Sequence, residues 1–328
     1  WAARKEMGGT TLMSVSLDHP RIAVLSGGIG PERDVSLNSG HALADALESF
    51  YPVDLIDVRE RELPRELDPA RHVVFSIIHG TFGEDGSLQA MLEEGGFTYA
   101  GCDSAASRLC MHKGNCKDKV RENGVRTVSD FRFHKPVEVL PESVIESLGT
   151  ELVVKPADQG SSVALHICSG KEELERVLGL LPEGSWMIEK RIMGREVTIG
   201  LLHGETLGIV EVVPEGGVYD YTRKYSAGKT EYRFPAVLDL ELEEEIRSMA
   251  KLAYESCNCR DFARVDFMIS EDGILYFLEI NTLPGLTTTS LFPKSASCSG
   301  YDFSSLSQKL LEGAMSRYQD VPSVLQQT

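Results

Sequence analysis

The chain has 328 residues, 42% of them hydrophobic, which is enough material for two or three domains with buried cores. Its formal net charge of −17 argues against nucleic acid or an anionic membrane as a partner, because both call for basic surfaces. The chain contains no apolar run of the roughly 18 residues that a membrane span requires. We therefore expect a cytoplasmic protein whose partners are small molecules.

The seven cysteines are scattered and lack the paired spacing of a zinc site or a disulfide framework. Cys257 and Cys259 are the only close pair. We expect reduced thiols and no metal at these positions.

Residues 1–20 precede the first organised segment and lack the continuous apolar core of a signal peptide. We expect a tail: a tag, the product of an upstream start, or the end of a preceding fused domain.

The first organised segment predicts a strand, a glycine-rich turn and a helix. An apolar run at residues 22–25 leads into Gly27 and Gly28, and a helical pattern follows through Leu47. Arg33 stands where a dinucleotide-binding fingerprint needs its third glycine, so that motif is excluded.

Further apolar runs at residues 53–56 and 73–78 predict alternating strands and helices around a mainly parallel sheet. Ligands of such sheets bind beyond the carboxyl ends of the strands, where Glu32 and His79 lie. Taken alone, a histidine there is more often structural, and a glutamate at a helix start can simply complement the helix dipole.

The middle of the chain carries a candidate phosphate site. A helical pattern includes Lys113, and the predicted strand 152–156 contains Lys155. A glycine-serine loop with Ser161 and Ser162 follows. Backbone N–H groups and hydroxyls of such a loop suit an anion that the lysine neutralises. A surface turn is the alternative interpretation.

A polar stretch between Val213 and Pro235 has the length of a functional lid. Its Gly228-Lys229-Thr230 resembles the end of a P-loop. We reject that reading, because Arg223 stands where the motif requires glycine and no strand-to-helix context surrounds it.

Residues 264–291 are the most informative part of the chain. Asp272-Gly273 predicts a two-residue hairpin turn, which pairs Glu271 with Ile274. The core face of the hairpin is then expected to carry Val265, Phe267 and Ile269 against Tyr276, Leu278 and Ile280.

The opposite face of this hairpin gathers four polar side chains. The same register places Asp266 opposite Glu279 and Arg264 opposite Asn281. Carboxylates directly across a ladder have side-chain roots about 5 Å apart and repel, so a positive charge is needed between them. Mg²⁺ fits, since it takes one or two carboxylates plus substrate phosphates. A solvated face neutralised by Arg264 is the alternative.

The segments Arg264-Val265-Asp266, Leu278 to Gly285, and Ser290-Leu291 resemble the metal and acyl-phosphate site of D-alanine:D-alanine ligases, members of the ATP-grasp superfamily. The resemblance extends from Arg21 to about Ala314, with the motifs in family order. It implies an α/β fold, α+β in its C-terminal part, with three-domain ATP-grasp architecture. It also implies a homodimer, with ATP and two Mg²⁺ as cofactors and Mn²⁺ as a possible substitute.

The implied domains follow one another along the chain. Residues 1–20 are a tail, 21–101 an N-terminal parallel α/β substrate domain, 102–188 a central ATP-grasp subdomain, and 189–328 the C-terminal ATP-grasp and catalytic domain.

The resemblance also assigns roles to residues. The metal ligands are Asp266, Glu279 and Asn281. The nucleotide site comprises Lys113, Lys155, Ser162, Glu189, Lys190, Ile192, Glu196 and Lys224. The substrate-binding residues are Glu32, His79, Arg264, Gly285, Ser290 and Leu291. The catalytic set comprises Glu32, Ser161, Tyr225, Arg264 and Gly285.

The implied reaction joins two D-alanines through a D-alanyl phosphate, for peptidoglycan precursor synthesis. A D-alanyl-D-lactate or D-alanyl-D-serine ligase is the alternative, and Tyr225 favours the dipeptide enzyme. An ATP-binding module without catalysis is disfavoured, because the metal ligands and Arg264 are all present. Ala164 departs from a glycine that is common in the family and could stiffen the phosphate loop.

Overall fold

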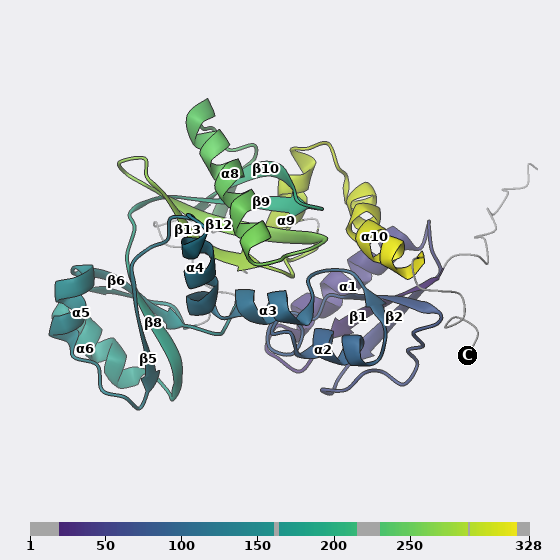
Figure 1. Ribbon diagram of the computed structural model, residues 1–328, viewed down its shortest axis with the longest axis horizontal. Coiled ribbons are helices and arrows are strands. Elements are labelled where there is room, and N and C mark those ends of the chain that lie inside the picture. Colours follow the sequence, from purple (N-terminus) through teal and green to yellow (C-terminus); the bar gives the residue numbers. More distant parts are fainter. Residues whose placement is uncertain (1–19, 161–163, 215–229, 288, 320–328) are drawn as a thin grey trace, which may run out of the picture.

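A computed structural model describes residues 20–160, 164–214, 230–287 and 289–319. Its strands form three sheets. Figure 1 shows the sheets side by side along the longest axis, with the sheet that contains β9, β12 and β13 in the middle. This arrangement agrees with the predicted α/β class.

The first sheet is parallel, as the alternating pattern predicted, and has the strand order β2-β1-β3-β4. Its strands are β1 (Arg21–Gly27), β2 (Val53–Val58), β3 (His72–Ser76) and β4 (Thr98–Tyr99). The helices α1 (Arg33–Leu47) and α2 (Ser87–Glu94) connect them. The C-terminal helix α10 (Phe303–Gln319) shares an apolar core with β1, β3 and α1, so the far end of the chain stabilises the first sheet.

A second sheet, on the left in Figure 1, has the antiparallel strand order β5-β8-β6-β7. Its strands are β5 (Asp130–Lys135), β6 (Glu151–Pro156), β7 (His166–Ser169) and β8 (Gly184–Lys190). The helices α5 (Pro141–Leu148) and α6 (Lys171–Leu180) cover one face. The two-residue period of β6 buries Leu152 and Val154 in that core and turns Val153 and Lys155 to the other face.

The middle sheet is antiparallel, with the order β11-β10-β9-β12-β13. Its strands are β9 (Gly194–Leu202), β10 (Glu205–Pro214), β11 (Thr230–Arg233), β12 (Phe262–Ser270) and β13 (Leu275–Asn281). The helices α3 (Ser104–Met111), α4 (Lys113–Glu122) and α8 (Leu240–Ser256) pack on one face. The short helix α9 (Leu291–Ser297) follows β13. The middle sheet therefore has one helix-covered face and one face left for the polar side chains.

The hairpin between β12 and β13 confirms the predicted pairs of Arg264 with Asn281 and of Asp266 with Glu279. The predicted pair of Glu271 with Ile274 is wrong. Ser270 donates its N–H to the Ile274 carbonyl at 2.9 Å, and Gly273, with a φ of 81°, completes a three-residue turn.

A β-bulge at Leu278 compensates for the longer turn. Phe267 pairs with Phe277 while Asp266 pairs with Glu279, which leaves Leu278 as the extra residue. The expected core face is therefore wrong beyond the bulge: Leu275 and Phe277 are buried, whereas Tyr276 and Leu278 are only partly so. The turn is one residue longer than predicted and β13 has one extra residue at the bulge, so the two changes cancel and Asp266 still pairs with Glu279.

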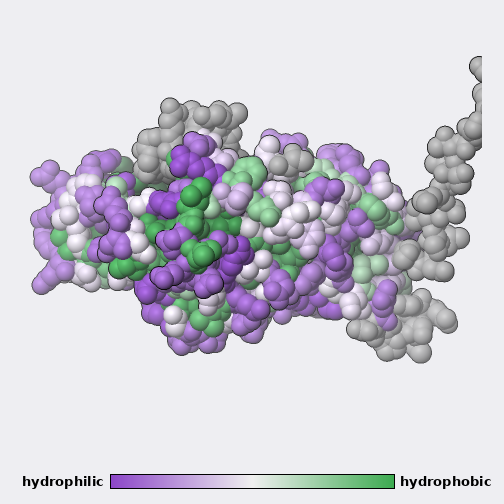
Figure 2. Space-filling model, turned by 90° about the horizontal axis from the view of Figure 1, so that it is seen from above, coloured by the Kyte–Doolittle hydropathy of each residue, from purple (hydrophilic) through white to green (hydrophobic). Residues whose placement is uncertain are grey.

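None of the helices in the described ranges combines the length and apolar character that crossing a bilayer requires. Figure 2 shows a surface on which hydrophilic residues separate smaller apolar patches.

Candidate functional site

A polar ladder, defined as Arg264, Asp266, Glu279 and Asn281, lies on the face of the middle sheet away from its helices. Arg264 donates to both carboxylate oxygens of Asp266, from Nε at 2.9 Å and from Nη2 at 2.8 Å. Asn281 donates its Nδ2 to Asp266 Oδ2 at 2.9 Å. Asp266 is thus held in one orientation by groups from both strands of the hairpin.

Sequence reasoning missed a further partner of Asp266 on the neighbouring strand. Thr198 in β9 pairs with Asp266 across the ladder, and its hydroxyl donates to Asp266 Oδ1. Thr198 follows Glu196 by two residues, so the period of the strand places both on the ligand-facing side. That period was the signal that could have identified it.

The second carboxylate of the ladder is paired with a lysine from α4. Lys113 Nζ lies 3.3 Å from Glu279 Oε2 and also donates to the Gln159 carbonyl. Each carboxylate therefore has a cationic side chain beside it, which shows that this face attracts positive charge. Two carboxylates and a side-chain amide provide the hard oxygen atoms that Mg²⁺ prefers. The residues present fit that ion.

A cavity of about 330 Å³ lies between the middle sheet and the second sheet. Val153 and Ile167 line it from the second sheet, and Met268 and Leu278 line it from the middle sheet. The bulge that removes Leu278 from the core thus places it in this wall. The predicted nucleotide residues that line the same cavity are Lys155, Glu189, Lys190, Ile192 and Glu196. Apolar walls with charged groups at the edges suit a flat heteroaromatic ring attached to an anion.

The buried carboxylate of Glu189 holds two lysines at the edge of this cavity. Lys117 Nζ lies 2.7 Å from Glu189 Oε1, and Lys155 Nζ lies 2.8 Å from Oε2. Burial alone would raise the pKa of Glu189, but the attraction of Lys155 and Lys117 outweighs it and lowers the pKa to about 2. Lys117 also lies 3.4 Å from Asp130, a residue that the sequence interpretation did not assign.

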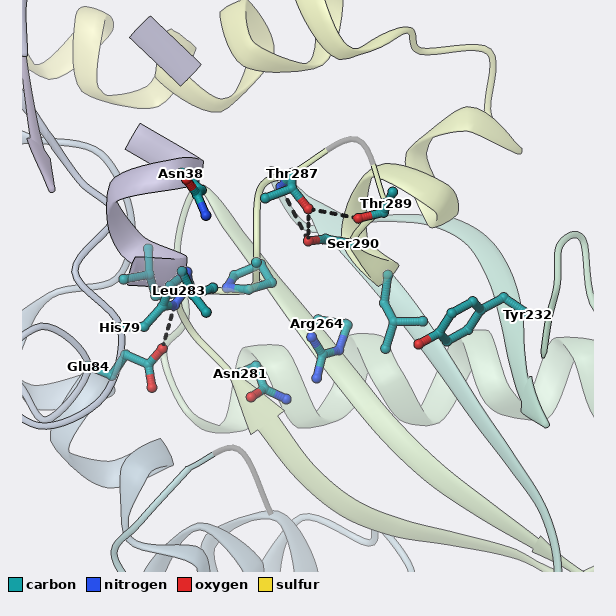
Figure 3. Close-up of a pocket in the computed structure, with 14 residues that line it drawn as sticks. Asn38, His79, Glu84, Tyr232, Arg264, Asn281, Leu283, Thr287, Thr289 and Ser290 are labelled. Carbon is teal, nitrogen blue, oxygen red and sulfur yellow. Dashed lines mark hydrogen bonds and ion pairs between the residues drawn. The ribbon is translucent and has the colours of Figure 1, made fainter. Parts of the chain in front are cut away.

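A second cavity, of about 270 Å³, lies between the first sheet and the middle sheet (Figure 3). Val35, Asn38, His79 and Glu84 line it from the first sheet. Arg264 and Asn281 reach it from the polar ladder, and the remaining wall is formed by Tyr232, Leu283, Pro284, Gly285, Thr287, Thr289, Ser290 and Leu291. The ladder is therefore open to this cavity.

His79 is fixed by a neighbour that the sequence interpretation missed. Its Nδ1 lies 3.0 Å from Glu84 Oε1, the contact drawn as a dashed line in Figure 3. Its Nε2 is buried and has no hydrogen-bond partner among the described residues. A buried unpaired ring nitrogen beside a cavity indicates a place for a polar ligand atom.

Glu32 lies at the N-cap position of α1 and is 6% exposed. Its Oε2 packs so closely on Gly80 that a Cβ there would lie 2.2 Å away. Glu32 does not itself line the second cavity, although Val35 and Asn38 from the same helix do. Gly80 follows His79 directly, so the glutamate supports the segment that carries the histidine.

The loop after β13 brings Gly285, Ser290 and Leu291, which the resemblance assigns to substrate binding, to the same cavity. Ser290 Oγ accepts the N–H of Thr287 at 3.2 Å and lies 2.8 Å from Thr287 Oγ1. Figure 3 shows Thr287, Thr289 and Ser290 together at the top, Arg264 and Asn281 below them, and His79 with Glu84 at the left. Four predicted site residues lie outside the described ranges: Ser161, Ser162, Lys224 and Tyr225.

The sequence is similar to known ligases over most of its length. The family model described as D-ala D-ala ligase C-terminus matches residues 125–312. The D-alanine--D-alanine ligase of Actinobacillus succinogenes is 38% identical over 306 residues, which cover 90% of this chain and 98% of that protein.

Solved structures of such ligases also superpose on the fold. The D-alanine--D-alanine ligase of Bacillus anthracis has a TM-score of 0.81 at 32% identity and covers 92% of this chain and 99% of its own. The same enzyme complexed with ATP gives a TM-score of 0.78 at 30% identity, again over 92% of this chain and 99% of its own. The VanG D-Ala:D-Ser ligase of Enterococcus faecalis gives 0.79 at 26% identity, over 91% of this chain and all of its own.

Proposed function

Because the chain belongs to the D-alanine–D-alanine ligase family, we propose that it joins two D-alanines at the expense of ATP through a D-alanyl phosphate and so supplies peptidoglycan precursors. The observation that carries this proposal is the position of the polar ladder between two cavities. The larger cavity suits a nucleotide and the smaller one suits amino acids. A phosphoryl group passing from one to the other would cross the ladder.

ATP would place its adenine between the apolar walls of the larger cavity, with Glu189, Lys190 and Ile192 at the edge of the base. Glu196, which also lines that cavity, would bind the ribose. Lys113 and Lys155 would bind phosphates, because Lys113 lies beside Glu279 of the ladder and Lys155 lines the larger cavity. Ser162 and Lys224 complete the proposed nucleotide site.

Asp266, Glu279 and Asn281 would hold two Mg²⁺, for which Mn²⁺ can substitute. Bound there, the cations would neutralise the phosphate charge that builds up during transfer. Lys113 lies beside Glu279, and Arg264 lies beside Asp266. The ammonium of Lys113 would then turn from Glu279 to a phosphate.

A carboxylate resists attack by an amine, so activation must come first. The carboxylate of the first D-alanine would attack the γ-phosphorus of ATP, form the acyl phosphate and release ADP. The amine of the second D-alanine would then attack the acyl carbon, and loss of phosphate and a proton would leave the peptide bond. Arg264 and the Gly285 N–H would stabilise the negative charge on the carbonyl oxygen.

The smaller cavity would hold both amino acids. Glu32 and His79 would position the first D-alanine, since His79 presents a buried unpaired nitrogen there. Ser290 and the Leu291 main chain would receive the carboxylate of the second. Ser161 and Tyr225 would close the site over them. We further propose a cytoplasmic homodimer with domains at 21–101, 102–188 and 189–328. The packing of α3 and α4 on the middle sheet, and of α10 on the first, means that these domains share cores.

The decisive experiment measures phosphate release with ATP and Mg²⁺. The four arms contain no amino acid, D-alanine alone, D-alanine with D-lactate, and D-alanine with D-serine. We expect release and dipeptide formation with D-alanine alone. Release that does not depend on D-alanine would refute the ligase assignment, and faster ester or D-serine product formation would favour the alternative ligases.

The metal assignment is tested by Asp266→Asn and Glu279→Gln, with Glu271→Gln in the exposed turn of the same hairpin as the control. We expect turnover to fall by at least about 100-fold in the first two, comparable to the loss of one transition-state contact, and to stay unchanged in the control. Circular dichroism verifies folding. Normal turnover in either ladder variant would exclude the role.

A further inference from the structure

Five of the seven cysteines converge in the core beneath the helix-covered face of the middle sheet. They come from the segment before α3, from α3, from α4 and from the turn after α8: Cys102, Cys110, Cys116, Cys257 and Cys259. All five are buried and unbonded to one another. Only one other buried core of the described residues contains a cysteine, Cys168. The thiols are therefore concentrated in one place rather than spread through the interior.

The distances between the sulfur atoms match a metal site. Cys110 Sγ lies 3.8 Å from Cys259 Sγ, and Cys116 Sγ lies 3.9 Å from Cys257 Sγ. The sulfurs of Cys110, Cys116 and Cys257 lie within 4.8 Å of one another, whereas the sulfur of Cys259 is not within that distance of all three. A tetrahedral zinc ion with Zn–S bonds of about 2.3 Å requires sulfur atoms about 3.8 Å apart. Bonded disulfide sulfurs would lie only about 2 Å apart.

The turn between α8 and β12 presents two of these thiols together. Asn258, between Cys257 and Cys259, has a φ of 52°, a left-handed conformation that is uncommon outside glycine. The N–H of Cys259 donates to the Tyr254 carbonyl at 3.0 Å, which fixes the turn against the end of α8. This is a common way for a helix to end, and it sets where the two thiols lie.

We propose that Cys110, Cys116 and Cys257 bind one zinc ion as thiolates and that Cys259, whose sulfur already lies 3.8 Å from that of Cys110, moves in as the fourth ligand. Four thiols lose four protons when Zn²⁺ binds, and the resulting site carries two negative charges. Zinc and soft thiolate ligands suit each other, and a closed site of four cysteines is structural rather than catalytic.

A bound zinc ion would stabilise the junction of α3 and α4, which carries the proposed phosphate-binding residue Lys113. Lys113 lies between Cys110 and Cys116, at the junction of α3 and α4. Cys257 and Cys259 belong to the turn that leads into β12, the strand of Arg264 and Asp266. The metal would tie the lysine-bearing junction to the ladder strand from the side opposite the substrates.

The test uses the full chain, purified without an affinity tag under reducing conditions, and measures bound metal by mass spectrometry. We expect about one zinc per chain. After metal removal, Co²⁺ should restore one equivalent and produce the intense near-ultraviolet thiolate-to-cobalt band together with the visible bands of a tetrahedral site. This readout does not depend on ligase activity.

Cys257→Ser is the variant of choice, and Cys168→Ser is its matched control, because both thiols are buried and only the first belongs to the cluster. We expect Cys257→Ser to lose the zinc and Cys168→Ser to retain it. If Cys257→Ser does not fold, the thiolate-to-cobalt band of the wild type still shows whether the cysteines bind the metal. A metal-free wild type without the thiolate band would overturn the proposal and indicate apolar packing of reduced thiols. A measured chain mass that is lower than the mass of the fully reduced chain by two hydrogen atoms per cysteine pair would indicate disulfides and would also overturn the proposal.

Discussion

Replacing Glu189 with glutamine removes the negative charge that holds two lysines at the edge of the larger cavity. The fall of its pKa from the usual 4.5 to about 2 corresponds to about 3 kcal/mol of stability, since one pKa unit is worth about 1.4 kcal/mol. After the change, Asp130 still lies 3.4 Å from Lys117, but Lys155 loses its partner at 2.8 Å. We therefore expect Glu189→Gln to destabilise the protein by about 3 kcal/mol at pH 7, as expected for a buried pair that loses one member.

The pH dependence provides an independent check on this reasoning. The folded-state pKa of Glu189 is lowered, so its stabilisation is complete above the unfolded-state value of about 4.5 and disappears as the pH falls toward about 2. At pH 4 the unfolded chain is already largely protonated at this residue. The difference between wild type and variant should therefore be about 1 kcal/mol smaller at pH 4 than at pH 7.

Urea unfolding at both pH values measures this difference, followed by the near-ultraviolet dichroism of Trp186, which lies in β8 with Glu189. Glu151→Gln in the neighbouring strand β6 is the control, because its side chain is 46% exposed and its contact with Arg191 is 3.5 Å long. The control should lose less than about 1 kcal/mol. Equal losses in the two variants, or a loss in Glu189→Gln that does not change with pH, would refute the argument.

Other variants test the remaining contacts. Gly80→Ala would place a Cβ 2.2 Å from Glu32 Oε2, so the KM for D-alanine should rise about 10-fold or more in steady-state assays. Gly96→Ala is the control, because Gly96 has a similar positive φ but no atom lies within 4 Å of the added Cβ. This variant should leave the KM unchanged. Arg264→Lys cannot make the two-point contact with Asp266, so kcat should fall about 100-fold, and an unaltered kcat would contradict the proposed role. Ala164→Gly should lower the free energy of unfolding, measured with urea, by less than about 1 kcal/mol. The reason is that glycine adopts the φ of 55° without steric strain, which offsets the greater conformational entropy of its unfolded chain. A larger loss would show that Ala164 is not strained at this φ.

The first sheet was predictable because its signals are local. Apolar runs alternate with helical patterns, and β1 and β3 lie where those runs occur. The register of the hairpin between β12 and β13 was predicted correctly at Asp266 and Glu279, but the prediction assumed a two-residue turn and no bulge. The turn has three residues instead of two, and no sequence signal indicated the bulge at Leu278 that restores the pairing.

Contacts between distant segments could not be predicted from spacing. Cys110 meets Cys259 across 149 residues, because α3 packs on the helix-covered face of the middle sheet. Lys117 in α4 meets Glu189 in β8 of the second sheet across 72 residues. A search for short metal motifs cannot detect such a cluster. Only the tertiary fold shows that α3 and α4 bring these side chains to the middle sheet.

The bulge at Leu278 constrains how the length of this hairpin can change. Deleting Leu278 alone would leave Phe267 opposite Phe277 and Asp266 opposite Glu279, because Leu278 is the unpaired residue of the bulge. The change would remove one wall residue of the larger cavity without moving the carboxylates. Deleting Tyr276 would instead draw Leu278 into the core position opposite Phe267 and turn Phe277 outward. The hairpin should therefore accept a deletion at the bulge and reject one in the core-facing part of β13.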